Sequence, residues 1–174
     1  MSSFRGIASQ TANLVGVIAL GASLAGCLQP LYGGVEGAEL RNQMAAIAIE
    51  PIPERLGHYL ANELRFSLNG NGSSVVPRYR LFISPRERVQ SPVIDTISGR
   101  ATAGTIVVDA EYRLVSVSGG APIAQGVAFS AASYDRTNQR FANIRAARDA
   151  EIRDAKALAD QIQTRLAASL SSAR

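Results

Sequence analysis

Residues 24–27 read Leu-Ala-Gly-Cys, and this tetrapeptide decides how much of the chain remains to fold. Cys27 is the only cysteine, so no disulfide can form within the chain. It closes an apolar run that begins at Leu14, and Arg5 is the only charged residue that precedes it. A charged start, a short apolar stretch and small residues before a cleavage point are the three parts of an export signal. The sequence therefore predicts that residues 1–26 are a signal peptide that is removed.

The same tetrapeptide predicts a modification of Cys27, because it resembles a bacterial lipobox. Ala25 and Gly26 are small enough for a protease to approach the backbone, and the thiol stands where a diacylglyceryl group is attached before cleavage. The alternative is a buried structural cysteine after a short core helix, but position, flanking residues and uniqueness favour lipidation. The run from Leu14 to Gly26 is shorter than the ~20 apolar residues of a membrane-spanning helix. We therefore expect lipid at Cys27 to hold the protein at a membrane.

The chain after the cleavage point, Cys27–Arg174, has a length that suits one domain. Of the 18 basic residues only Arg5 precedes Cys27, and all 14 acidic residues follow it, so the mature formal charge is only +3. This charge is too small to indicate a nucleic-acid partner. Pro30 and three glycines favour an extended tether over residues 28–39. We therefore divide the mature chain into a lipidated tether, 27–43, and one periplasmic α+β domain, 44–174.

Hydrophobic periodicity predicts two helices in the domain. Leucines recur every fourth residue from Leu56 to Leu68, so one helix is expected over 54–68, where Asn-Gly-Asn-Gly ends it. A longer helix is expected over 141–170, because its apolar residues follow a three-four spacing. The apolar stripe of this helix contains Phe141, Ile144, Ile152, Ala155, Ala159, Ile162, Leu166 and Leu170. Its solvated faces are expected to carry Arg145, Arg148, Arg153, Asp154, Lys156 and Asp160.

Four strands are predicted, over residues 44–52, 75–89, 105–118 and 123–134. We expect Ser84-Pro85 to interrupt the second strand, and residues 91–104 to form a hairpin or loop. The third strand alternates clearly, with Ile106, Val108, Ala110, Tyr112 and Leu114 on one face. We expect Ile152, Ile162 and Leu166 of the long helix to pack on Ile106, Val108 and Leu114 of this face, or on the opposite parity if the register slips.

The fourth strand has two contrasting faces. Val127 and Phe129 share one parity, whereas the other parity carries only small residues. These small residues are Ala124, Gly126, Ala128, Ser130 and Ala132. Small side chains allow another backbone to approach closely, so this face is predicted to lie against a helix or a partner.

The sequence lacks the residues on which the common catalytic sites depend. It contains no Gly-Xaa-Ser-Xaa-Gly, no Walker loop and no Gly-Xaa-Gly-Xaa-Xaa-Gly. His58 is the only histidine and falls on the polar face of the first helix, so neither a zinc site nor a catalytic triad can be assembled readily. Asp109 and Glu111 share a strand face, where cross-strand arginines are the expected partners. We therefore predict a protein without enzymatic activity, cofactor or metal.

Arginines gather along the second predicted strand and the loop after it. Arg86, Arg88 and Arg100 are the candidates for contact with lipid phosphate or with a protein partner, because guanidinium groups bind phosphate through two parallel hydrogen bonds. The alternative, which is favoured for any single arginine, is an edge strand whose charges prevent pairing with other chains.

Three stretches together resemble the alphaproteobacterial LPS-assembly lipoproteins of the LptE family. The first is Leu-Ala-Gly-Cys-Leu-Gln-Pro-Leu-Tyr-Gly-Gly at 24–34. The second is Ile-Glu-Pro-Ile-Pro-Glu-Arg-Leu-Gly at 49–57, which runs into a helix. The third is Ala-Ser-Tyr-Asp at 132–135 followed by Ala-Ala-Arg-Asp-Ala-Glu at 146–151, although the family pattern has asparagine where Asp135 stands.

The resemblance implies an α+β fold in which two helices pack on one face of a four-stranded, mostly antiparallel sheet, in the order β-α-β-β-β-α. It also implies a lipid-anchored subunit on the periplasmic side of the outer membrane, which plugs the LPS-inserting β-barrel and contacts lipopolysaccharide. Two alternatives remain open: an auxiliary lipoprotein of a lipid-transport ABC system, and a periplasmic enzyme.

The prediction for Cys27 is tested by the intact mass of the protein in the membrane fraction. The expected mass is that of the chain from Cys27 onward plus two or three acyl chains, since one chain binds a membrane only marginally. Cys27→Ala should leave an unprocessed or mislocalised protein. A chain that still begins at Met1, or a free Cys27 thiol, would contradict the prediction.

Overall fold

The computed structural model describes residues 34–69, 72, 75–91, 99 and 101–172. The predicted signal peptide, Cys27 and Arg100 therefore lie outside the described residues. The chain divides into two compact units, Met1–Ala38 and Glu39–Arg174. All strands, and the two helices predicted from the sequence, belong to the second unit.

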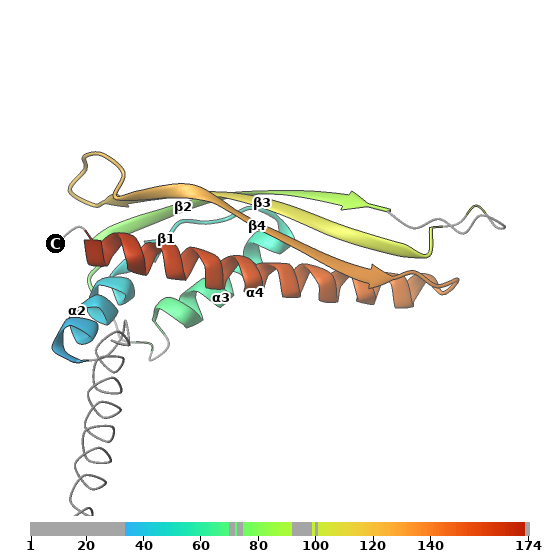
Figure 1. The fold of residues 1–174 in the computed structure, drawn as a ribbon, viewed down its shortest axis with the longest axis horizontal. Helices are drawn as coiled ribbons and strands as arrows, with labels where there is room; N and C mark the ends of the chain where they lie inside the picture. Colours follow the sequence, from blue (N-terminus) through green and yellow to red (C-terminus); the bar gives the residue numbers. More distant parts are fainter. Residues whose placement is uncertain (1–33, 70–71, 73–74, 92–98, 100, 173–174) are drawn as a thin grey trace, which may run out of the picture. The chain divides into compact units, whose positions relative to one another are not determined.

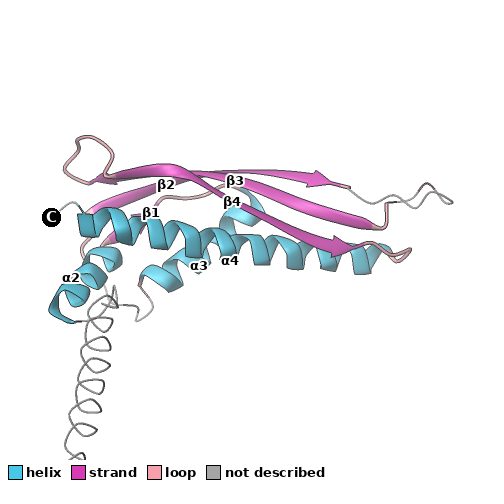
Figure 2. Ribbon diagram, viewed as in Figure 1, coloured by secondary structure: helices cyan, strands magenta, loops and turns pink. Residues whose placement is uncertain are grey.

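The second unit is an α+β domain with its helices on one face of a four-stranded sheet (Figure 1; Figure 2). The strand order is β1-β2-β3-β4; β1 and β2 are parallel, and the other neighbouring pairs are antiparallel. This confirms the predicted fold class. The described elements are α2 (Gly34–Ala45), β1 (Ile47–Ile49), α3 (Glu54–Leu68), β2 (Tyr79–Gln90), β3 (Ala103–Ser116), β4 (Ala124–Asp135) and α4 (Arg140–Ser172).

Helix α2 was not predicted. The extended conformation expected for residues 28–39 is wrong from Gly34 onward, and Met44 lies in the last turn of this helix instead of in a strand. Leu40 and Met44 are both buried in the core. Their burial outweighs the poor helix propensity of the nearby glycines, since packing usually decides whether a short helix forms.

Strand β2 continues through Pro85, so the interruption predicted there is wrong. The amide of Tyr79 and the carbonyl of Leu81 point toward β1, whereas the carbonyl of Arg78 points toward β3. Backbone groups alternate along a strand, so odd-numbered residues of β2 face the β1 side and even-numbered residues face β3. Beyond Leu81 no described strand pairs with β2 on the β1 side, and the Pro85 nitrogen faces this edge without removing a bond to β3.

Helix α4 packs across β3 and β4, as expected from the small-residue face of β4. Ala124, Ala128 and Ala132 are buried beneath it, while Val127 and Phe129 lie half-exposed on the opposite face. Leu158, Ile162 and Leu166 are fully buried, as are Ile106, Val108 and Leu114 of β3. The prediction for Ile162 and Leu166 is confirmed, but Ile152 is 40% exposed and does not belong to the core.

Ile152 is exposed because α4 turns another face inward at this level, where Glu151, Asp154 and Ala155 are buried. Arg55 bonds to Glu151, and Ser67 accepts a bond from Gln163, so the two helices run in the same direction with α3 beside residues 150–164 of α4. Helix α4 has 33 residues and α3 has 15, so the first turns of α4 extend beyond the start of α3. Phe141 and Ile144 lie in these first turns and are exposed there.

Leu166→Ala should lower the free energy of unfolding by about 2–5 kcal/mol, because it opens a cavity in a fully buried site. The matched control is Ile152→Ala on the same helix, which should cost under about 1 kcal/mol because its side chain is already partly solvated. Urea unfolding of both variants measures the difference, and equal losses would contradict this description of the core.

Candidate functional site

One end of the domain gathers most of the features that suit a binding site. Strand register places the end of β2, the start of β3 and the end of β4 together, and α4 begins beside them. We call this end the distal end. The opposite, proximal end contains the start of β1, whose preceding residue Ala46 bonds to Arg78 and Tyr79.

Arg86 and Arg88, two of the three arginines predicted to bind, lie on the face of the sheet opposite the helices. Arg86 pairs with Glu111 at 3.5 Å, and Arg88 pairs with Asp109. These pairs confirm that Asp109 and Glu111 have cross-strand arginine partners. The side chains of Arg86 and Arg88 remain 73% and 61% exposed, so each guanidinium keeps donors free for a partner.

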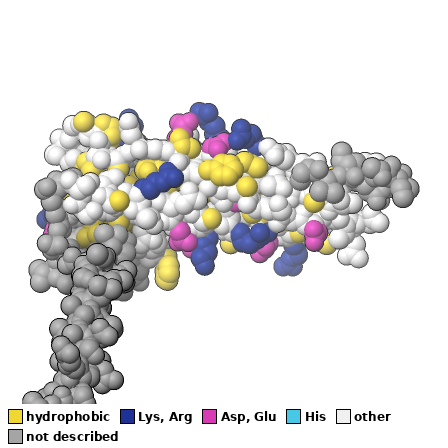
Figure 3. Space-filling model, in the orientation of Figure 1, with side chains coloured by type: hydrophobic (Ala, Val, Ile, Leu, Met, Phe, Trp, Pro, Cys, Tyr) yellow, Lys and Arg dark blue, Asp and Glu magenta, His cyan; other side chains and the backbone are white. Residues whose placement is uncertain are grey.

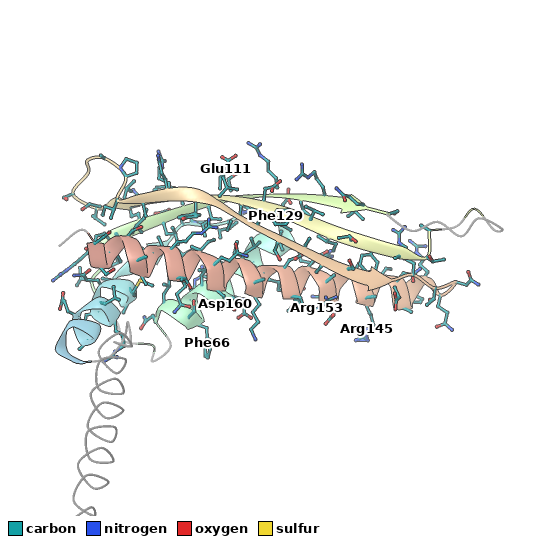
Figure 4. All side chains as sticks on the ribbon, in the orientation of Figure 1. Phe66, Glu111, Phe129, Arg145, Arg153 and Asp160 are labelled. Atoms are coloured by element: carbon teal, nitrogen blue, oxygen red, sulfur yellow. The ribbon has the colours of Figure 1, made fainter. Side chains whose placement is uncertain are left out.

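The sheet face that carries these pairs is open, and it mixes charged and apolar side chains (Figure 3). The Phe82 ring lies between the guanidinium groups of Arg80 and Arg113, at 5.3 and 5.2 Å from its centre. A hydrogen bond to Glu50 raises the pKa of Arg80. Figure 4 shows Glu111 and Phe129 on this face, away from the helices. We call it the open face.

A cavity of about 610 Å³ lies at the distal end, where β4 leads into α4. Arg136 lies against the Tyr134 ring, 5.9 Å from its centre, and donates to the Ser91 hydroxyl at 3.3 Å. Arg140 has no ion-pair partner among the described residues. The residues that line the cavity are Ala101, Thr102, Tyr134, Arg136, Thr137, Asn138, Arg140, Asn143, Ile144 and Ala147.

Side-chain bonds fix the turn beside this cavity. The Asn143 side chain accepts from the Thr137 amide at 2.7 Å and donates to the Thr137 carbonyl at 2.8 Å. Tyr134 packs on Gly104 of β3, where an added Cβ would lie 2.6 Å from the ring. Two arginines with amide and hydroxyl donors beside them suit phosphate or carboxylate. No site was predicted at residues 136–140; the two arginines in Arg-Thr-Asn-Gln-Arg were the available signal.

Two acidic side chains of α4 are buried between the helices and the sheet. Asp154 is 1% exposed and accepts from the Ser130 hydroxyl at 2.5 Å, while its second oxygen, Oδ2, has no partner. Burial raises the pKa of Asp154, although the bond from Ser130 opposes this effect. Placing Asp154 on a solvated face was therefore wrong, because the residue pattern does not show where β4 would lie.

The second buried acid, Glu151, binds Arg55 through both carboxylate oxygens. The hydrogen bond and charge of Glu151 raise the pKa of Arg55. Glu87 points to the same side of the sheet, where desolvation and then repulsion from Glu151 raise its pKa. These acids and Arg55 mark the point where α3 begins beside α4.

The described residues contain no group of three acidic, histidine or cysteine side chains that could hold a metal ion. His58 is exposed, as predicted, with its Nε2 at 3.2 Å from the Asn62 amide nitrogen. Within the described part of the chain, no helix is long and apolar enough to cross a membrane.

A family model described as LptE, lipopolysaccharide-assembly, matches residues 44–166. This chain belongs to the LptE family. It is therefore a lipopolysaccharide-assembly lipoprotein of a non-catalytic family, and both the resemblance and the prediction of a non-enzymatic role are confirmed. The LptE family is associated with outer-membrane lipopolysaccharide assembly. The comparison with curated protein sequences finds no match.

Solved structures share the fold. A crystal structure at 2.40 Å resolution, described as a lipoprotein of Caulobacter crescentus CB15, has a TM-score of 0.64 and 22% identity. The similarity covers 79% of this LptE-family chain and 98% of that one. A minor lipoprotein of Acinetobacter baumannii has a TM-score of 0.53 and 18% identity, over 71% of this chain and 91% of that one.

Asp154→Asn should change how stability depends on pH. The raised pKa means that the folded state binds the Asp154 proton more tightly than the unfolded state does. The wild type is therefore most stabilised by this proton below the unfolded pKa of about 4, and loses that stabilisation as pH rises through the raised value. The amide does not titrate, so relative to the wild type the variant should gain stability from pH 4 to pH 7.

Urea unfolding of the wild type and the variant at several pH values measures this gain. Asp160→Asn, which removes an exposed carboxylate from the same helix, is the matched control. A difference between the wild type and Asp154→Asn that is constant with pH would contradict the assignment.

Proposed function

We propose that this LptE-family chain is an outer-membrane lipoprotein subunit of the lipopolysaccharide translocon. In this role it plugs and supports the LPS-inserting β-barrel from the periplasmic side and contacts lipopolysaccharide with its distal end. The observation that carries the proposal is the family match over residues 44–166. The Leu-Ala-Gly-Cys sequence at 24–27 supports the lipid anchor.

The direction of insertion is supported by the path of the chain. Residues upstream of β1 lead toward Cys27, and they enter the domain at its proximal end, beside Ala46. Helix α4 runs from the distal to the proximal end with 33 residues, about 50 Å at 1.5 Å per residue. A bilayer is about 40–45 Å thick with its headgroups. A domain inserted with its distal end leading would therefore reach across the membrane.

The distal end has the side chains that such a position requires. Arg86 and Arg88 are exposed on the open face, and Arg136 and Arg140 line the cavity. Four guanidinium groups at one end suit the phosphates of lipid A, and the polar lumen of a barrel accommodates charged side chains. Exposed Phe141 supplies apolar surface beside them.

Photo-crosslinking in cells tests this proposal. Probes at Arg86, Arg88 and Arg100 should capture the barrel protein, lipopolysaccharide or both, because Arg86 and Arg88 belong to the end that is inserted and Arg100 follows in the segment that joins β2 to β3. Probes at Arg145, Arg153 and Lys156, on the exposed side of α4, are the matched controls for orientation.

Capture of the barrel only by the α4 probes would mean that the α4 side of the domain, and not the open face, meets the barrel, and would overturn the proposed orientation. Co-purification with an inner-membrane ABC complex, without any captured barrel, would replace this role with that of an auxiliary transport lipoprotein.

A further inference from the structure

The two edges of the sheet differ in whether other side chains bond to their outward backbone groups. At the β4 edge, side chains of α4 donate to outward carbonyls: Arg153 to Ser133 at 2.9 Å, and Gln161 to Phe129 at 2.8 Å. Arg165 donates to the next carbonyl along, that of Val127, at 2.5 Å. Because an added strand would need these acceptors, α4 closes this edge against other chains.

The β2 edge has no such cover from the described part of the chain. Strand β1 ends at Ile49, and the last bond to it runs from the Glu50 amide to the Leu81 carbonyl. Beyond Ile83, the outward groups belong to Pro85, Glu87 and Val89, and no other described residue bonds to them. Pro85 lacks an amide hydrogen, but the amides of Glu87 and Val89 and three carbonyls remain available. Unpaired backbone groups in such a row form a template for a further strand.

The charged side chains beside this edge disfavour strand pairing with a second copy of the chain. Antiparallel pairing of two β2 edges, centred on Glu87, would set Arg86 of one copy opposite Arg88 of the other and the two Glu87 carboxylates opposite each other. Registers centred on Arg86 or on Arg88 would pair identical arginines. Like charges directly opposite each other destabilise a strand pair.

We propose that the edge of β2 from Pro85 to Val89 is a docking site for an extended acidic segment of another protein, which adds a fifth strand to the sheet. Acidic side chains of that segment lie on the open face beside Arg86 and Arg88. Each of these arginines makes an ion pair within the domain and still has free donors directed to solvent.

On the opposite face of the added strand, an apolar side chain meets Val89, which is 55% exposed. The partner is thus recognised by alternation, with acidic residues on one face and an apolar residue on the other.

The experiment uses the full chain purified in detergent and short capped peptides of alternating Thr and Glu around one central Val. Amide resonances and hydrogen exchange of Glu87 and Val89 report on the edge. The acidic peptide should protect both amides. The same peptide with Lys in place of Glu, and an N-methylated form that cannot complete the strand ladder, should protect neither. The measurement contains no barrel and no lipopolysaccharide, so its outcome is separate from that of the proposed function.

A charge-swapped variant provides the matched protein control. Arg86→Glu with Glu111→Arg, and Arg88→Asp with Asp109→Arg, keep both ion pairs and the composition but place acids next to the edge. This variant should bind the acidic peptide about tenfold more weakly and the basic peptide more tightly. Val89→Pro, which removes one outward amide, should also weaken binding.

The proposal is overturned if the acidic peptide leaves Glu87 and Val89 unprotected at millimolar concentration. It is also overturned if the wild-type protein binds acidic, basic and N-methylated peptides equally, a comparison that holds even where the swapped variant fails to fold.

Discussion

The close approach of α4 to the small-residue face of β4 is the contact on which the domain depends. Ala124, Ala128 and Ala132 leave room for the helix, which then buries Leu158 and Ile162. The same approach brings three polar side chains of α4 to the outer carbonyls of β4. The packing of α4 on β4 therefore both forms the core and covers one edge of the sheet.

That contact also carries a cost. It buries the Asp154 carboxyl with one oxygen unpaired, and Ser130 bonds only the other oxygen. A buried polar group without a partner is unfavourable, so Asp154 is expected to reduce stability while fixing the position of α4 along β4. The burial of Glu151 is less unfavourable than that of Asp154, because Arg55 bonds to both of its carboxylate oxygens.

The unequal lengths of α3 and α4 separate the domain into a packed half and a half that is open to partners. Beside α3 the apolar stripe of α4 is buried from Ala155 onward, whereas Phe141 and Ile144 are exposed where α3 has not begun. Strand β2 is likewise paired on both sides only where β1 reaches it. Exposed apolar side chains, arginines and a free strand edge thus gather toward the distal end, as a protein that works within an assembly requires.

Sequence alone determined the features that depend on short periodicity. The leucine repeat predicted helix α3 at residues 54–68, and the alternation of apolar and polar residues predicted strand β3. The face of small residues in β4 predicted that a helix would pack closely there. Asp109 and Glu111 could be assigned arginine partners because neighbouring strands place opposite charges within reach. The family resemblance likewise came from short stretches of sequence, and the match over 44–166 confirmed it.

Only the tertiary structure decided which residues of a stripe are buried and which edges are free. Ile152 and Ile162 share one predicted stripe, but at the level of Ile152 the helix turns Glu151 and Asp154 inward instead. Asp154 looks solvated until β4 is placed against it. Pro85 interrupts a strand in principle, yet its nitrogen faces the edge that β1 leaves unpaired. In each case the outcome depends on a neighbour distant in sequence, and local pattern carries no information about where that neighbour ends.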